Sequence, residues 1–192
     1  LYPLLPQTLR TLGVLMVVIG GVWAAFEQNA ARLLGYGVIF ENGFALIALS
    51  LTNQGGLPLL AVSFLPRMAV ISLWAFSLGF LRQQNGDLRL GALAGMLRRA
   101  PWPSLGLLAA VFSLGGLPLL AGFPVHQALL ERLGGESVGA AVWAAAGSAA
   151  FLIGGFRLLN ALVQISPPDS GPLRMNWPQR VLMAVGIAVL LL

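Results

Sequence analysis

The fold is decided by one stretch near the middle of the chain, which reads SLGGLPLLAGFPVH over residues 113–126. Pro118 and Pro124 lack the backbone N–H that a continuous helix would need at their positions. The stretch ends at His126, the only histidine of the sequence. Three glycines add conformational freedom to the same segment: Gly115, Gly116 and Gly122. We therefore expect a helix that is broken here, with an ionisable side chain directly after the break.

The composition around this stretch is that of a membrane protein. Of the 192 residues, 58% are hydrophobic and 9% are charged, whereas about 25% of the residues in a soluble domain are charged. The mean hydropathy of +0.86 leaves too few polar residues to cover a soluble exterior. A soluble globular fold is therefore excluded, and we expect an all-α polytopic bundle of transmembrane helices.

The types of charged and metal-ligating residue exclude several functions. The chain has no lysine, which excludes phosphate-binding Walker loops and Schiff-base chemistry. It has no cysteine and one histidine, which excludes iron–sulfur clusters, thiolate zinc sites and two-histidine metal sites. Its arginines are scattered between apolar runs and form no stripe of the kind that binds nucleic acid. We expect no metal or cofactor held by side chains, no nucleic-acid partner and no bond chemistry in this chain.

Uncharged runs bounded by charges, glycines and prolines predict the transmembrane spans. The last uncharged run, 181–192, is shorter than the roughly 20 residues that cross a bilayer, and the chain begins with Leu1. We therefore expect residues 1–192 to be a single transmembrane domain cut from a longer chain, with a truncated final helix. The expected spans are residues 11–26, 33–51, 57–81, 102–130 and 137–165, followed by a helix from residue 180 onward.

The arginines predict how the helices are oriented. Assigning the connections alternately to two sides places Arg10 and Arg132 on one side and seven arginines on the other, at positions 32, 82, 89, 98, 99, 174 and 180. By the positive-inside rule, the side that holds the loop 82–99 is cytoplasmic. Leucines at positions 88, 90, 93 and 97 predict a short interfacial helix in this loop. The prolines of residues 166–177 predict an irregular connection.

Four ionisable residues interrupt the apolar spans: Glu41, Arg67, His126 and Arg157. A charge at the bilayer centre costs roughly 2.5–3.5 kcal/mol, so these side chains are expected to face protein, water or each other. Glu41 and Arg67 fall at similar depth in helices that a short turn joins, and we expect them to pair. Such a pair either fixes helix packing or takes part in ion movement. Arg157, close to a helix end, is expected to reach the interface.

The broken segment itself permits two interpretations. Interrupted helices beside an ionisable group are typical of ion sites in transporters, because freed backbone groups and helix ends can hold water or ions. The alternative is a passive proline kink with an inert polar side chain. We favour the functional interpretation, in which His126 and the backbone of the broken helix together form the site. The backbone residues of this site are Gly115, Gly116, Pro118, Gly122 and Pro124.

Three stretches resemble one family. Residues 113–126 are similar to the signature SLAGIPPxAGFxxK of the antiporter-like membrane subunits of complex I, which also occur in Mrp-type antiporters and membrane-bound hydrogenases. Residues 28–44 resemble the family's QxDxKRLLAYSSIxHxGY, with Arg32 and Tyr36 at its arginine and tyrosine, and residues 87–101 resemble its DLxGLxxRxP. The chain is most similar to the quinone-proximal, NuoN-like member. The resemblance implies the second, C-terminal one of two inverted repeats.

The chain departs from these motifs at three positions. His126 stands where the family has its broken-helix lysine, Glu41 stands at the histidine of the second motif, and Ala31 stands at its lysine. Imidazole keeps a protonatable group at the broken helix, but its ordinary pKa is about 6.5, against about 10.4 for a lysine amine. The usual lysine relay of the family is therefore absent from this sequence.

The resemblance implies a proton-translocating membrane subunit of an NADH (or ferredoxin):quinone oxidoreductase. Glu41, Arg67 and His126, bridged by water, would form its mid-membrane polar axis. Quinone, FMN and iron–sulfur clusters would belong to partner subunits in a bacterial cytoplasmic membrane or an equivalent energy-coupling membrane. Two alternatives stay open: a degenerate structural subunit without conduction, and a subunit of an Mrp-type Na⁺/H⁺ antiporter.

Overall fold

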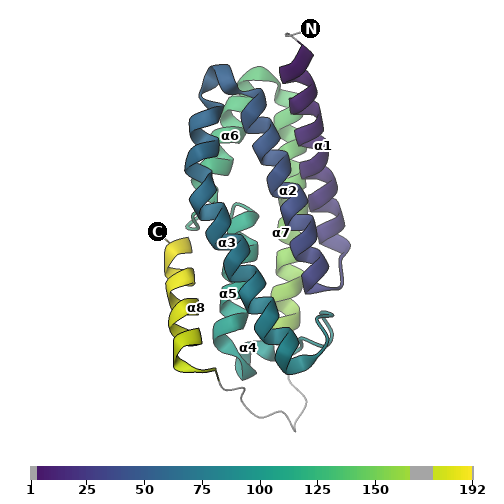
Figure 1. Cartoon of the computed structure of the whole chain (residues 1–192). Helices are drawn as coiled ribbons and strands as arrows, with labels where there is room; N and C mark the ends of the chain where they lie inside the picture. Colours follow the sequence, from purple (N-terminus) through teal and green to yellow (C-terminus); the bar gives the residue numbers. More distant parts are fainter. Residues whose placement is uncertain (1–3, 165–174, 192) are drawn as a thin grey trace.

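The computed structural model describes residues 4–164 and 175–191, and every regular element in these two ranges is helical. α1, α2, α3 and α7 are each long and apolar enough to cross a membrane, and α5 and α8 are shorter apolar helices. The expected all-α polytopic bundle is confirmed (Figure 1). The helices are α1 (Leu4–Phe26), α2 (Ala30–Ser50), α3 (Gly56–Asn85), α4 (Met96–Arg99), α5 (Pro101–Leu114), α6 (Phe123–Glu136), α7 (Val138–Val163) and α8 (Trp177–Leu190), with a 3₁₀ turn at Thr52–Gln54.

Several helices are longer than the uncharged runs. α1 begins at Leu4, before the uncharged run. Its first turns tolerate polar residues, because the hydroxyls of Thr8 and Thr11 donate hydrogen bonds to the backbone carbonyls four residues earlier and so are not left unpaired. α3 continues through Arg82 to Asn85. The expected fourth span, 102–130, is interrupted as predicted: α5 ends at Leu114, and α6 runs from Phe123 to Glu136, beyond the expected end at residue 130. Of the connection predicted at 166–177, residues 165–174 lie outside the described residues.

Small residues let α1 pack tightly against α2 and α7. A methyl group added at Gly21 of α1 would lie 2.0 Å from the carbonyl oxygen of Gly147 in α7, and one added at Gly13 would lie 2.8 Å from that of Gly43 in α2. Backbones approach this closely only where side chains are absent, which is a common mode of helix association in membranes. These three helices therefore form one closely packed side of the bundle (Figure 1).

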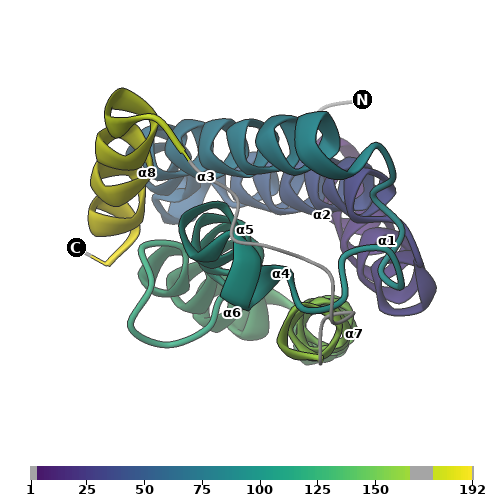
Figure 2. The same ribbon diagram turned by 90° about the horizontal axis from the view of Figure 1, so that it is seen from below.

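α3, α5 and α8 form the other side of the bundle. Figure 2 shows α8 beside α3 and α5, at the end of the molecule away from α1. Met183 of α8 approaches Ser77 of α3 and the glycine at position 106 in α5, where a small residue leaves room for it. The broken segment between α5 and α6 lies on this side, so α8 helps to enclose it.

The interfacial helix predicted in the loop 82–99 is wrong. After α3 ends at Asn85, only Met96–Arg99 is helical in this loop, and Leu88, Leu90 and Leu93 are buried in the protein core. Main-chain hydrogen bonds hold the loop against the α1–α2 turn: Ala30 N–H donates to Leu88 O at 2.9 Å, and Leu90 N–H donates to Gln28 O at 2.7 Å. The leucines follow a helical spacing in sequence, but they fill the end of the bundle instead of facing lipid.

The two ends of the bundle carry the arginines as the sequence predicts. Arg10, near the start of α1, lies 3.5 Å from Glu136 at the end of α6, so these two helix ends share one side. The turn between α2 and α3 lies at this end, and α4 and the α1–α2 turn lie at the other (Figure 1). Five arginines of the predicted cytoplasmic side belong to elements at this second end: Arg32 in the first turn of α2, Arg82 in the last turn of α3, Arg89 in the loop that follows, and Arg98 and Arg99 in α4.

Candidate functional site

The helix break follows α5 and begins with a left-handed glycine. Gly116 has φ of 72°, a conformation that glycine adopts without steric cost. Its N–H donates to Ser113 O at 3.1 Å, and Leu117 N–H donates to Phe112 O at 3.0 Å. This pair of hydrogen bonds is a Schellman motif, which ends a helix and satisfies its last carbonyls. The predicted interruption of the helix is confirmed, and it starts at Gly115 and Gly116.

Groups from neighbouring elements satisfy the backbone inside the break. Gly122 N–H donates to the side-chain oxygen of Ser113 at 3.2 Å, and Ala121 N–H donates to Leu190 O, at the end of α8, at 2.9 Å. Pro118 lies in the irregular part, as expected. Pro124 differs from expectation: it lies in the first turn of α6, where a missing N–H breaks no helical hydrogen bond, so it starts the second helix.

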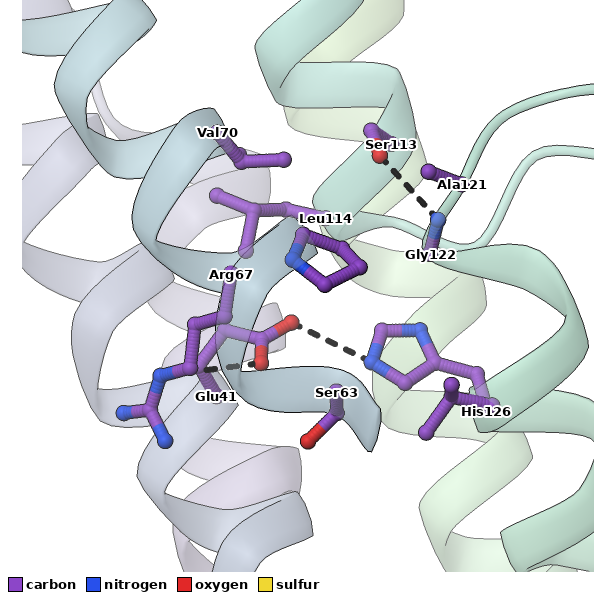
Figure 3. A pocket seen from close by; sticks show the side chains of 11 residues that line it. Glu41, Ser63, Arg67, Val70, Ser113, Leu114, Ala121, Gly122 and His126 are labelled. Atoms are coloured by element: carbon purple, nitrogen blue, oxygen red, sulfur yellow. Dashed lines mark hydrogen bonds and ion pairs between the residues drawn. The ribbon is translucent and has the colours of Figure 1, made fainter. Parts of the chain in front are cut away.

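Glu41 lies between the two cationic or protonatable side chains that the sequence singles out. Its Oε1 is 3.1 Å from Nε2 of His126, and its Oε2 is 4.0 Å from Nε of Arg67. Figure 3 shows the carboxylate of α2 between the imidazole of α6 and the guanidinium of α3. The expected pairing of Glu41 with Arg67 is confirmed. The shorter contact, however, is with His126, so these two residues touch directly, where the sequence analysis expected bridging water.

The three side chains are largely enclosed by protein. Glu41 is 8% exposed and His126 is 7% exposed. The imidazole of His126 stacks on the ring of Phe44, with centroids 4.2 Å apart and planes inclined by 22°. Burial strengthens the attraction between opposite charges and makes an unpaired charge costly, so the cluster keeps its members close together.

Two small cavities flank the Glu41 carboxylate. Each has a volume of about 20 Å³, which is enough for about one water molecule. The first extends from the carboxylate to Ser113 and Gly122 of the break (Figure 3). The second lies toward Phe44 and Leu129. The site can therefore hold single water molecules beside a carboxylate, an imidazole and a guanidinium.

Two residues with a part in this arrangement were missed by the sequence analysis. Asn42 accepts a hydrogen bond from Nη2 of Arg67 through its side-chain oxygen, and so fixes the guanidinium next to Glu41. Ser113 holds the break through Gly122. Both are polar residues inside otherwise apolar runs, which is the signal that could have identified them.

Other residues singled out from the sequence lie elsewhere. Arg32 is exposed in the first turn of α2, Tyr36 follows one turn later, and neither lines the two cavities beside Glu41. Arg157 donates from Nη1 to Ala25 O at the end of α1, which places its charge at the C-terminal end of a helix. Among the described residues, no three His, Asp or Glu side chains gather in a group that could hold a metal ion.

These features define a class of protein: an integral membrane protein with a discontinuous helix whose break adjoins a buried carboxylate–imidazole pair. The chain belongs to the family described as NADH:quinone oxidoreductase/Mrp antiporter, transmembrane, whose model matches residues 2–154. It is 30% identical to NADH-quinone oxidoreductase subunit N of Thiobacillus denitrificans over 188 residues, which cover 94% of this chain and 38% of the relative. It is 31% identical to NADH-quinone oxidoreductase subunit 14 of Thermus thermophilus, with 97% of this chain and 43% of the relative covered.

Solved structures share the same arrangement of helices. A chain of respiratory complex I from Thermus thermophilus matches with a TM-score of 0.76 and 28% identity, covering 97% of this chain and 42% of that one. A chain of the Mrp complex from Dietzia matches with a TM-score of 0.87 at 18% identity, covering 97% and 43%, and this likeness concerns the fold alone. The chain spans less than half the length of the relatives it matches.

Proposed function

We propose that this chain is part of a proton-translocating membrane subunit of an NADH (or ferredoxin):quinone oxidoreductase. Protons would pass along a mid-membrane polar axis made of Glu41, His126 and Arg67. The observation that carries the proposal is the 3.1 Å contact between the Glu41 carboxylate and the His126 imidazole, directly after a break in a membrane helix. Imidazole is the side chain whose ordinary pKa allows its charge to change between about pH 5 and 8.

The three residues have different roles in this proposal. His126 accepts and releases the proton, Glu41 receives it or stabilises the imidazolium, and Arg67 supplies a fixed positive charge that replaces a mobile lysine. The break supports them, because Gly115, Gly116, Pro118, Gly122 and Pro124 together end one helix and start the next beside His126. Apart from these proton transfers, no covalent bond is made or broken in this chain.

The family match supports a proposal about the assembly. The partners are other membrane subunits of a multi-subunit respiratory complex and the lipid bilayer, and nucleic acid is not among them. Quinone, FMN and iron–sulfur clusters would bind to the partner subunits. The membrane would be the bacterial cytoplasmic membrane or an equivalent energy-coupling membrane, with the arginine-rich loop 82–99 on its cytoplasmic side.

The test is the substitution of His126 in the full-length subunit within its assembled complex. His126→Gln keeps a polar side chain of similar reach but cannot carry the proton, so we expect normal assembly and a lower proton-to-electron ratio in proteoliposomes. His126→Lys restores the residue of the family signature and should retain part of the pumping. Unchanged pumping in a normally assembled His126→Gln complex would refute the relay role.

The same measurement separates the two alternatives. A structural subunit without conduction would give the same proton-to-electron ratio in both variants as in the parent complex. An Mrp-type antiporter subunit would instead give proton movement that depends on a sodium gradient and continues without electron flow. Either result would replace the proposed function.

A further inference from the structure

We propose that an open cavity at the α4 end of the bundle binds the phosphate group of a membrane phospholipid, with Arg157 as its charged ligand. The cavity lies where the α1–α2 turn, the loop 82–99 and the last turns of α7 meet, and its volume is about 230 Å³. Figure 2 views this end, where the loop that follows α3 passes α1 on its way to α4. The cavity is separate from the two beside Glu41, so the proposal goes beyond the proposed function and does not depend on it.

The polar groups that line this cavity are hydrogen-bond donors. Arg157 supplies a guanidinium, and three side-chain amides and one glycine line the same space: Gln28, Asn160, Gln164 and Gly91. A cation site would need carboxylates, and none of the described lining residues is acidic. The carboxylate nearest in sequence, Glu27, is already engaged, because its Oε1 accepts the N–H of Gln28 at 2.8 Å and that of Asn29 at 3.0 Å. The cavity therefore suits an anion.

Most of these donors have no protein partner. A guanidinium has five N–H donors, and the only hydrogen bond of Arg157 within residues 4–164 and 175–191 runs from Nη1 to Ala25 O. In the same ranges no hydrogen bond is made by the side-chain amides of Gln28, Asn160 and Gln164 or by the N–H of Gly91. The arginine is half-buried and fixed by its bond to α1, so its remaining donors are held in place for a ligand.

The backbone at this end of the bundle does not oppose an anion. The C-terminal ends of helices carry partial negative charge, and here their carbonyls already have partners. Ala25 O accepts from Arg157, and Ala161 O accepts from Gly95 N–H at 3.4 Å. Arg89, exposed in the loop that lines the cavity, adds a second positive charge close by. The local balance of charge is therefore positive.

Exposed apolar side chains beside the cavity indicate that the anion belongs to a lipid. Phe156 precedes Arg157 in α7, Phe26 follows Ala25 at the end of α1, and both rings are more than half exposed. Trp23, one turn earlier in α1, is also more than half exposed, and tryptophan is enriched at the depth of the lipid headgroups. A phospholipid can place its phosphate in the cavity and its acyl chains against these rings. A free phosphate ion would use the polar part alone.

The cavity also matches a phosphate in size and in donor geometry. Its volume of about 230 Å³ is several times the roughly 30 Å³ that one water molecule occupies in the liquid, which leaves room for a phosphate and part of its glycerol. The planar guanidinium of Arg157 presents parallel N–H groups to two phosphate oxygens. Asn160 and Gln164 would bind the remaining oxygens from the same helix. The bound lipid would thus join α7 to the α1–α2 turn and to the loop.

The test uses the full-length subunit in its assembled complex after removal of native lipid. Phosphatidylglycerol that carries a photoreactive diazirine in one acyl chain is added in mixed micelles, and labelled peptides are quantified by mass spectrometry. Labelling of the peptides that contain Phe26 or Phe156 should saturate, and the half-saturation concentration reports the affinity. Peptides that contain Trp143, exposed near the other end of α7, report ordinary contact with the surrounding lipid. Labelling at Phe26 and Phe156 that rises without saturation, as at Trp143, would overturn the site.

Gly91 offers a matched pair of variants, because a methyl group added there meets nothing within 4 Å and a longer side chain can be accommodated. Gly91→Glu places a carboxylate at the cavity and should raise the half-saturation concentration about tenfold, which corresponds to about 1.4 kcal/mol. Gly91→Gln has nearly the same shape without the charge and should bind like the parent. Equal half-saturation concentrations in the two variants would contradict the proposal.

A second pair removes a donor without changing Arg157 or its bond to Ala25. Asn160→Ala should weaken binding about tenfold, the effect of losing one hydrogen bond to a charged group. Gln83→Ala is the control, since Gln83 is an exposed amide of α3 at the same end of the bundle and does not line the cavity. The same affinity in Asn160→Ala and Gln83→Ala would remove Asn160 from the site and count against it.

Inorganic phosphate separates the lipid from a free ion. In excess it should leave the labelling unchanged, because it makes no contact with the phenylalanines. Loss of labelling at Phe26 and Phe156 in its presence would show a site for free phosphate, and the phospholipid assignment would fall. An electron cryomicroscopy map of the native complex should show phosphate density beside Arg157, and a partner's side chain in that place would overturn the proposal. None of these measurements needs electron flow, so failure of the proposed function would not affect them.

Discussion

Arg67 reaches the Glu41 carboxylate across the α2–α3 hairpin, with its Nε 4.0 Å from Oε2 and its Nη2 bonded to the neighbouring Asn42. The short connection at Thr52–Gln54 brings the two helices back alongside each other, so the two charges meet at the same depth. The pair is thus a property of the hairpin, and His126 joins it from a different helix.

The first prediction concerns this pair. Removing one member of a buried pair leaves an uncompensated charge and costs roughly 3–5 kcal/mol, so Glu41→Gln and Arg67→Gln should each lower the thermal stability of the assembled complex. The double variant should lose less stability than the sum of the two. A thermal-inactivation series on the three variants gives the coupling energy, and additive losses would show that the residues act independently.

A second prediction concerns the close contact of α1 with α7. Gly21→Ala places a methyl group 2.0 Å from the backbone oxygen of Gly147, so the helices must separate, which we expect to cost about 1–3 kcal/mol. Gly35→Ala is the control, because a methyl group there meets nothing within 4 Å. It should leave stability unchanged or raise it by up to about 1 kcal/mol through helix propensity. Differential scanning fluorimetry of the detergent-solubilised complexes compares them, and equal melting temperatures would contradict the tight contact.

A third prediction concerns the start of α2. The side-chain oxygen of Asn29 accepts hydrogen bonds from Ala31 N–H at 2.9 Å and Arg32 N–H at 3.4 Å, which caps the helix. Asn29→Ala should lose about 0.5–2 kcal/mol of stability, whereas Asn29→Asp keeps the acceptor and should lose little. The proportion of folded subunit recovered after heating the membranes measures the stability of both variants. A loss in Asn29→Asp as large as in Asn29→Ala would show that the cap is not what stabilises this turn.

A fourth prediction concerns orientation, and the absence of cysteine from the chain makes it simple to test. Arg89 and Gly135 are exposed at opposite ends of the bundle. In sealed, oriented membranes, an impermeant thiol reagent should label Gly135→Cys from the periplasmic side and Arg89→Cys only from the cytoplasmic side. Labelling of both variants from one side, or the reverse pattern, would contradict the assignment from the positive-inside rule.

The sequence predicts the helical framework well, because charge and hydropathy decide which segments can enter a bilayer. The break is predictable for the same kind of reason: Pro118 and Gly116 disturb a helix whatever surrounds them. The depth of Glu41 and Arg67 also follows from counting along two helices joined by a short turn. Each of these inferences depends on local sequence alone.

The remaining features depend on contacts between distant segments. A leucine spacing near 3.6 residues fits an interfacial helix and a buried turn equally well, and only the pairing of the loop with the α1–α2 turn places Leu88 and Leu93 in the core. Direct contact between Glu41 and His126 depends on how α6 approaches α2. Pro124 was assigned to the interruption because the sequence does not reveal where the second helix begins.

The hydrogen bond from Ala121 N–H to Leu190 O joins the helix break to the end of α8 through main-chain atoms only. Since neither side chain takes part, a mutational scan that exchanges side chains leaves this contact intact, and any loss that it records at the buried Leu190 reports side-chain packing instead. A scan of this protein would therefore understate the dependence of the break on α8, and only a replacement that removes the amide hydrogen, such as Ala121→Pro, would expose it.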